Sequence, residues 1–181
     1  MLTFKEYILE TPELDYGDSR RFTEQMTNRI RDNIEKEHSN SQKIGKSEEG
    51  MYHKLITKED PSRIHYYHSV SNKPREISVV KDNIQYVVSK GENGNSEHNK
   101  WLMKHHAKNF GELSSYETHT LGSKKLWSDL AKDGDKDFSI HHNDGNEEHK
   151  IDSEYLNKNE NNIWNKGREY RKHKLTIKSN V

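Results

Sequence analysis

The sequence contains no cysteine, and this absence excludes several classes of protein. Without cysteine there can be no disulfide scaffold, no zinc ribbon and no thiolate nucleophile. The chain also lacks any apolar run that approaches the roughly 18 residues of a membrane span. Its N-terminus lacks the basic start and the apolar run of a secretory signal. We therefore expect a soluble, intracellular protein that has no membrane as a partner.

Hydrophobic residues are scarce as well, at 28% of the chain, and only 33 of the 181 residues are Leu, Ile, Val or Phe. A share below roughly 20% is typical of disorder, but disorder of a whole chain usually needs a large net charge too. Here 30 basic residues balance 30 acidic ones, and nine Tyr and three Trp supply further buried area. We expect one small core with much solvated surface, and no nucleic acid as a partner.

The pattern divides the chain into a leader-like segment, a helix with a linker, and a domain. These three segments cover residues 1–10, 11–50 and 51–181. Thr11–Pro12 ends the first amphipathic helix, because the residue before proline avoids the α region. A second helix is expected over about 19–36, where Phe22, Met26, Ile30 and Ile34 recur every fourth residue. The polar stretch 38–50 reads as a linker or long loop.

Strands and helices are expected in turn within the domain. Short stretches of β-branched and aromatic residues predict strands, and longer stretches with apolar residues at helical spacing predict helices. The expected strands are 63–70, 76–80, 84–89, 112–116, 137–142 and 174–178, and the expected helices are 97–109 and 123–132. This order is typical of the α+β class. We expect a mixed, mostly antiparallel central sheet with helices on its faces, preceded by N-terminal helices.

Turn and cap residues mark the ends of several of these elements. Asn72–Pro74 reads as a turn, and Lys81–Asn83 reads as a hairpin connection. Ser96 precedes the expected helix 97–109 as its N-cap, and Gly111 follows it where a helix stops.

The first ten residues, MLTFKEYILE, carry a pattern of their own. Thr3, Phe4, Tyr7, Ile8 and Glu10 match the pattern Met-x-Thr-aromatic-x-x-aromatic-Ile-x-Glu. The stretch resembles the capsid-targeting leaders of internal head proteins in T-even-like tailed phages. That resemblance implies cleavage after Glu10, with the phage capsid and the prohead protease as partners. The alternative is an ordinary amphipathic N-terminal helix.

A glycine-containing segment lies between the expected strand 84–89 and the expected helix 97–109. A helix N-terminus offers free N–H groups and partial positive charge, and glycines let backbone approach a pyrophosphate closely. The segment resembles the acyl-CoA loop of the GNAT acetyltransferase superfamily, Gln/Arg-x-x-Gly-x-Gly/Ala, although it lacks the leading Gln/Arg and ends in Ser. The resemblance implies acetyl-CoA as cofactor, bound by Gly91, Gly94, Asn95 and Ser96. The alternative is a plain loop.

The next stretch of the chain carries a second set of matching positions. The pattern Ser-Asp-x-x-His/Gln-Thr-x-Gly-Gly-x-x-x-Trp-x-x-Leu corresponds here to Ser115, Thr118 to Thr120, Gly122, Trp127 and Leu130. Tyr116 replaces the Asp, and Ser123 replaces one Gly. The stretch resembles phage-carried GNAT-like proteins, which implies a GNAT-like fold over about Arg63–Lys178.

Acyl transfer to an amine needs a base near the amine and an acid for the leaving thiolate. Under the GNAT resemblance, Glu117 or His119 is the expected base and Tyr116 is the expected acid. The alternative is that the segment 117–120 only caps the helix that follows.

Twelve histidines are many for a chain of this length. His65 and His68 lie on one expected strand at positions that point to opposite faces, and no His-Glu-x-x-His spacing is present. We expect scattered surface histidines, a net charge that rises quickly below about pH 6.5, and no metal site. The alternative is a metal-dependent hydrolase whose site joins histidines to Asp144 or Glu148 in space.

The first expected function is that of a phage-encoded GNAT-like enzyme, which transfers an acyl group from acyl-CoA to an amine substrate. The alternative is a non-enzymatic internal virion protein, or an injected inhibitor of a host protein. Either would act in the host cytoplasm, and packaging in the virion would deliver it there. Binding of acetyl-CoA separates the two.

Overall fold

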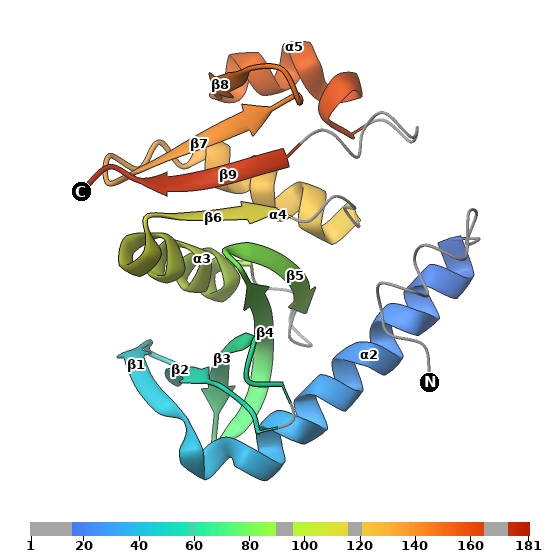
Figure 1. Ribbon diagram of the computed structural model, residues 1–181, viewed down its shortest axis with the longest axis vertical. Coiled ribbons are helices and arrows are strands. Elements are labelled where there is room, and N and C mark those ends of the chain that lie inside the picture. Colours follow the sequence, from blue (N-terminus) through green and yellow to red (C-terminus); the bar gives the residue numbers. More distant parts are fainter. Residues whose placement is uncertain (1–15, 59, 90–95, 116–120, 165–173) are drawn as a thin grey trace.

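The computed structural model describes residues 16–58, 60–89, 96–115, 121–164 and 174–181 (Figure 1). The helices are α2 (Tyr16–Glu37), the short 3-10 helix η1 (His38–Asn40), α3 (Glu97–Phe110), α4 (Leu121–Lys132) and α5 (Ser153–Trp164). The strands are β1 (Gln42–Lys46), β2 (Met51–Leu55), β3 (Ile64–Val70), β4 (Lys73–Lys81), β5 (Ile84–Ser89), β6 (Glu112–Ser115), β7 (Phe138–Asn143), β8 (Glu148–Lys150) and β9 (Lys174–Ser179).

These strands form one sheet in the order β1-β2-β3-β4-β5-β6-β9-β7-β8. Among the described strands, β5 and β6 are the one parallel pair, and the other neighbours are antiparallel. A parallel pair needs a crossover connection, and α3 is the helix between these two strands. The described chain is therefore α+β with a mixed, mostly antiparallel open sheet, as predicted.

Two tight turns set the register of the central strands. Ser71 and Asn72 connect β3 to β4, and Asp82 and Asn83 connect β4 to β5, all with φ between 52° and 63°. Two-residue hairpin turns with positive φ at both positions favour Asn and Asp. The second turn confirms the predicted hairpin. The first turn begins one residue earlier than predicted, so Pro74 already lies in β4.

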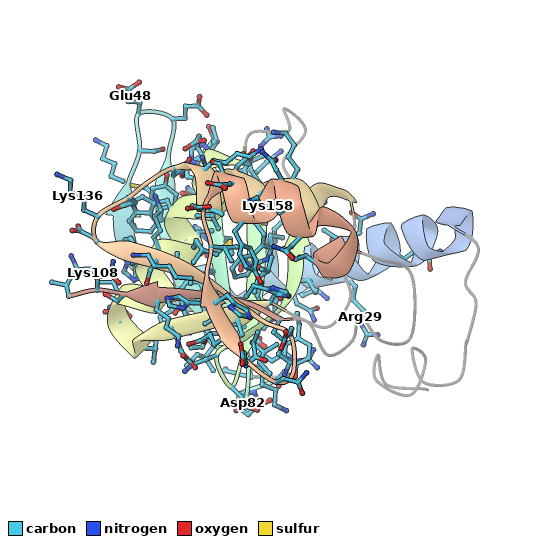
Figure 2. The ribbon with its side chains drawn as sticks, turned by 90° about the horizontal axis from the view of Figure 1, so that it is seen from above. Arg29, Glu48, Asp82, Lys108, Lys136 and Lys158 are labelled. Atoms are coloured by element: carbon cyan, nitrogen blue, oxygen red, sulfur yellow. The ribbon has the colours of Figure 1, made fainter. Side chains whose placement is uncertain are left out.

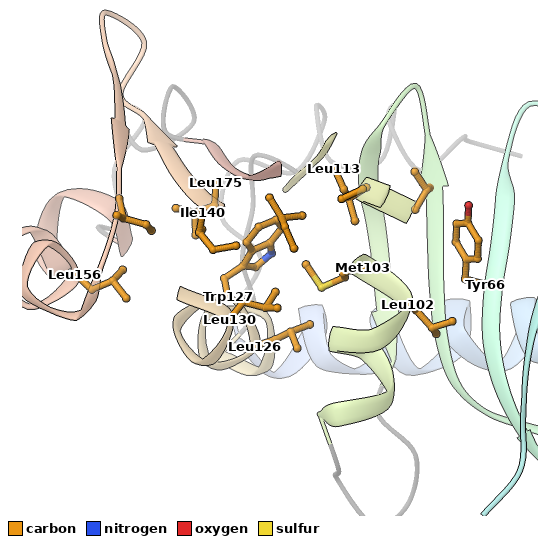
Figure 3. Packing of buried hydrophobic residues seen from close by; sticks show 14 of the residues in the cluster. Tyr66, Leu102, Met103, Leu113, Leu126, Trp127, Leu130, Ile140, Leu156 and Leu175 are labelled. Carbon is orange, nitrogen blue, oxygen red and sulfur yellow. The ribbon is translucent and has the colours of Figure 1, made fainter. Parts of the chain in front are cut away.

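Two clusters of buried residues lie on opposite faces of the sheet. The larger one forms where α3 and α4 pack on the strands, with Met103 beside Trp127 (Figure 3). The smaller one joins Ile34 of α2 to residues of β2, β3 and β4. Tyr66 belongs to the larger cluster and Tyr67 to the smaller one, because successive strand residues face opposite sides of a sheet.

The C-terminal end of α3 is as predicted from the sequence, whereas its N-terminal cap is not. Gly111 has φ of 89°, and its N–H donates to the carbonyl of Ala107 at 2.7 Å, as a C-terminal stop requires. Ser96 stands at the N-cap position, but its side chain makes no capping hydrogen bond. The glycine prediction is confirmed, and the side-chain cap is corrected.

Four elements, β1, β2, β8 and α5, were not expected from the sequence. The predicted linker 38–50 contains β1. The strand was missed because an edge strand pairs through its backbone and can be largely polar, and β1 adds only Ile44 to the core. In α5, the polar residues surround two widely spaced buried side chains, Leu156 and Ile163. The predicted helix over 1–10 lies outside the described residues.

Candidate functional site

A buried polar cluster lies where α3 packs over β3 and β4. It consists of His68 of β3, Glu76 of β4 and His98 of α3, and is called here the His–Glu–His cluster. All three residues are buried, and one nitrogen or carboxylate oxygen from each lies within 4.8 Å of the other two. Buried polar groups are costly unless they have partners, so the surrounding structure has to supply them.

A β-bulge aims Glu76 at His68. The register of β3 against β4 shifts between Tyr67 and Ser69. Across this interval β3 contributes one residue, His68, whereas β4 contributes two, Arg75 and Glu76. A bulge bends its strand and redirects a side chain. The carboxylate Oε2 of Glu76 consequently lies 3.2 Å from Nδ1 of His68.

The first turn of α3 brings His98 onto the cluster. Its ring stacks on that of His68, with the centroids 3.8 Å apart and the planes 9° from parallel. Its Nδ1 lies 2.9 Å from the hydroxyl of Tyr52. Tyr52 in turn stacks on Trp101, one turn further along α3. His98 and Trp101 share a helix face because residues three apart are neighbours on an α-helix, so α3 and β2 together fix the His98 ring.

The turn between β1 and β2 holds the other nitrogen of His68. The hydroxyl of Ser47 lies 2.9 Å from Nε2 of His68, and it accepts the backbone N–H of Gly50 at 3.0 Å. A Cβ on Gly50 would lie 2.0 Å from the carbonyl oxygen of Ser69. The turn can therefore approach β3 this closely only with glycine at position 50.

The same turn places a carboxylate at the outer side of the cluster. Glu48 projects into solvent at the tip of the turn (Figure 2). The carboxylate of the next residue, Glu49, has its Oε2 3.6 Å from Nε2 of His98. The side chain of Glu49 is 70% exposed. The three residues of the cluster are buried, and the cluster therefore borders solvent on the side of Glu49.

The pKa values at the cluster follow from burial and from neighbouring charges. Burial lowers the pKa of His68 and the adjacent His98 lowers it further, while Glu76 acts in the opposite direction. Burial raises the pKa of Tyr52, and the carboxylates of Glu76 and Glu49 raise it further. His68 is therefore held toward the neutral imidazole and Tyr52 keeps its proton near pH 7. Neutral imidazole and carboxylate are the forms of these side chains that bind transition metals.

Ser47, His68 and Glu76 also stand in the order hydroxyl, imidazole, carboxylate, which is the order of a hydrolytic triad. The oxygen of Ser47, however, accepts the backbone N–H groups of Glu49 at 3.2 Å and of Gly50 at 3.0 Å. A hydroxyl oxygen has two lone pairs, and both are used within the turn. Ser47 therefore orients His68 and is a poor candidate for a nucleophile.

Six of the ten histidines in the described residues are buried, which corrects the expectation of scattered surface histidines. The buried ones are His53, His65, His68, His98, His106 and His142. Several of them pair with buried tyrosine hydroxyls, as His106 does with Tyr66 at 3.0 Å. Burial lowers the pKa of His53 and of His106 to about 4. Between about pH 6.5 and pH 4, these two residues therefore stay neutral in the folded chain, whereas surface histidines become charged.

The alternative metal site with Asp144 or Glu148 is not brought together in the described residues. Asp144 lies 4.0 Å from His149, and Glu148 lies 3.6 Å from His141, as separate pairs that are at least partly exposed. The group that the described residues do assemble is the His–Glu–His cluster. Sequence reasoning missed it because its members come from three elements. A bulge and a helix start, neither of which has a fixed spacing in sequence, bring them together.

Most residues predicted for the acyl-CoA site lie outside the described residues. These are Gly91, Gly94, Asn95, Tyr116, Glu117 and His119, whereas Ser96 is described at the start of α3. The strands that precede the two segments are the parallel neighbours β5 and β6. The carboxyl ends of these two strands, Ser89 and Ser115, point the same way.

Two residue pairs of the parallel pairing fall within the described part of the chain. They are Ile84 with Ser114 and Gln85 with Ser115. β5 then continues to Ser89, which pairs with Ile77 on β4. Ile77 is adjacent to Glu76, so the end of β5 lies next to the strand position that carries the cluster's carboxylate.

No protein-family model matches the chain, and neither a curated protein nor a solved structure matches it. Within the ranges that the structure describes, no helix has both the length and the apolar character that crossing a bilayer requires. Any function therefore has to follow from the chemistry and geometry of this chain's own residues.

Proposed function

We propose that the chain is a GNAT-like protein that binds acyl-CoA at the open end of the β5–β6 pair and transfers the acyl group to an amine. The observation that carries the proposal is the pairing of β5 with β6, the one parallel pair among the described strands. The glycine-containing segment follows β5, and α3 follows that segment. In sheets with parallel strands, ligands bind outside the carboxyl ends of strands that separate.

The start of α3 supplies the chemistry for the pyrophosphate of acyl-CoA. α3 is 14 residues long, and its first backbone N–H groups have no partner within the helix. These groups and the helix dipole favour an anion at this end. Glu97 in the first turn carries the opposite sign, but Nζ of Lys100 lies 2.6 Å from its carboxylate and offsets that charge.

The transfer reaction assigns roles to the predicted residues after β6. Glu117 or His119 takes a proton from the attacking amine, whose nitrogen then forms a bond to the thioester carbon. The carbon–sulfur bond breaks, and Tyr116 donates a proton to the leaving thiolate. These residues directly follow β6 in the sequence.

A second candidate is a non-enzymatic protein of the same fold, either packaged in a phage head or acting on a host protein after injection. One observation favours it. Ser96, at the last position of the predicted loop pattern, has a helical backbone and makes no side-chain capping bond. The family pattern has Gly or Ala there, and the leading Gln/Arg is also missing, so α3 follows a sequence that lacks part of the family's loop pattern.

Calorimetry with acetyl-CoA, with free CoA as a control ligand, tests the proposal. We expect micromolar binding that Gly94→Pro weakens, because proline removes an N–H and fixes φ in the segment. Gly134→Ala, in the exposed turn after α4, is the matched control for loss of a glycine elsewhere, and it should leave binding unchanged. Absence of binding up to millimolar acetyl-CoA contradicts the enzyme and leaves the non-enzymatic candidate.

A further inference from the structure

We propose that the His–Glu–His cluster is a binding site for one divalent transition-metal ion, Zn²⁺ above all. His68, Glu76 and His98 supply the three protein ligands. Two imidazoles and one carboxylate are a common ligand set for Zn²⁺ in proteins. This inference is independent of acyl-CoA binding, since the three residues belong to β3, β4 and α3 and none lies in the predicted cofactor segment.

The spacing of the ligand atoms is close to what a tetrahedral site needs. Ligands at the usual metal bond lengths of about 2.0–2.1 Å are about 3.3 Å from one another in a tetrahedron. Nδ1 of His68 and Oε2 of Glu76 are already 3.2 Å apart, and the whole set lies within 4.8 Å. Only His98 therefore has to approach the other two.

The hydrogen bonds outside the cluster fix which nitrogen of each ring is available. Nε2 of His68 faces the hydroxyl of Ser47, which leaves Nδ1 for the metal. Nδ1 of His98 faces the hydroxyl of Tyr52, which leaves Nε2. Metal-binding histidines almost always donate the second ring N–H to an oxygen acceptor, which orients the ring. The hydroxyl of Tyr52 is such an oxygen for His98. For His68, the Ser47 oxygen has to release one of its two backbone N–H donors before it can accept from Nε2.

Glu49, which lies outside the group of ligand atoms within 4.8 Å of one another, would become the fourth ligand by moving toward the ion. Its Oε2 is 3.6 Å from the free Nε2 of His98, on the side of the cluster that meets solvent. An exposed carboxylate on a turn can move toward the ion at little cost, whereas Glu76 is held by its strand. Exchange with solvent at Glu49 also gives the ion a route into an otherwise buried site.

Metal binding also has a structural requirement and an electrostatic reason. The rings of His68 and His98 are nearly parallel at 3.8 Å. A metal has to lie in the plane of each ring that binds it, so the His98 ring must turn out of the stack and the Tyr52 hydroxyl that faces its Nδ1 must move with it. In return, the divalent charge neutralises the buried carboxylate of Glu76, which is costly to hold in a low-dielectric interior.

The test is calorimetry with ZnCl₂ on the full chain after removal of metal by a chelator. We expect one ion per chain, and substitution by Co²⁺ should give the visible absorption of a tetrahedral site. His98→Gln and Glu76→Gln should each weaken binding by about 100-fold or more, and Ser47→Ala should weaken it by about 10-fold or more, as changes around metal ligands do. Circular dichroism of each variant shows whether the fold is kept.

His142→Gln is the matched control, because His142 is also buried and also pairs with a tyrosine, Tyr155 at 2.9 Å. It should leave Zn²⁺ affinity unchanged. Two results overturn the proposal: no binding at up to millimolar Zn²⁺, or binding that His98→Gln and Glu76→Gln leave as strong as the control does. Either result would make the cluster a hydrogen-bonded part of the core. Neither result bears on acetyl-CoA binding, which is measured with metal absent.

Discussion

Moderate acid should destabilise this protein through its buried histidines, and His106 is the clearest case. Its ring is 1% exposed, with Nδ1 facing the hydroxyl of Tyr66 at 3.0 Å and Nε2 facing the side-chain oxygen of Asn83 at 3.0 Å. These bonds fit a neutral imidazole that accepts at Nδ1 and donates at Nε2. Burial lowers its pKa from 6.5 to about 4.

The direction and size of the effect follow from proton linkage. The unfolded chain binds a proton at His106 below about pH 6.5, whereas the folded chain does not until about pH 4. Stability from this group is therefore present above pH 6.5 and is lost as pH falls from 6.5 toward 4. At pH 5 the loss is about 2 kcal/mol for one such histidine. His53, whose pKa is also lowered to about 4, adds a similar amount.

Urea unfolding at pH 7 and at pH 5 measures this loss. The wild-type chain should lose about 4 kcal/mol from the two residues together, a large share of a typical total of about 5–15 kcal/mol. His106→Gln should reduce the change between the two pH values by about 2 kcal/mol, whatever its effect at pH 7. His149→Gln, on a side chain that is 36% exposed, is the control. Equal losses in wild type and His106→Gln would refute the linkage.

The remaining predictions concern packing. Gly50→Ala should lower the free energy of unfolding by more than about 2 kcal/mol, because its Cβ would lie 2.0 Å from the carbonyl oxygen of Ser69, and it should also weaken Zn²⁺ binding. Gly45→Ala, whose Cβ would lie 2.7 Å from the side chain of Trp101, is the comparison variant. Equal stability of Gly50→Ala and wild type would contradict the close approach of the turn to β3. Trp127→Ala should cost about 3–5 kcal/mol, since Trp127 is 0% exposed at the centre of the larger cluster, and thermal unfolding unchanged within a degree or two would show that the α4–sheet packing is wrong.

Much of the α+β architecture was readable from local pattern. The positive-φ turn at Asp82 and Asn83 and the glycine that ends α3 depend on a few adjacent residues, and both were predicted correctly. β1 and α5 were missed because their sequences are largely polar. Their burial depends on packing against other elements, the larger buried cluster for Ile44 of β1 and α4 for α5.

The candidate sites divide in the same way. The glycines and acid–base residues proposed for acyl-CoA were chosen from adjacent residues, and they remain predictions because they lie outside the described residues. The His–Glu–His cluster was invisible in the sequence, and the histidines were expected at the surface. Only pairing and packing showed that they are buried next to tyrosines and a carboxylate.

By itself, the sequence determined what depends on neighbours along the chain, namely the periodicity of the central strands and helices, the turn residues and the absence of thiol chemistry. The tertiary structure alone decided which polar groups share an interior. The bulge opposite His68 turns Glu76 toward it, and the first turn of α3 lays His98 across both. Such a site depends on strand register and helix docking. These are set by burial summed over the whole core, and no short stretch of sequence records them.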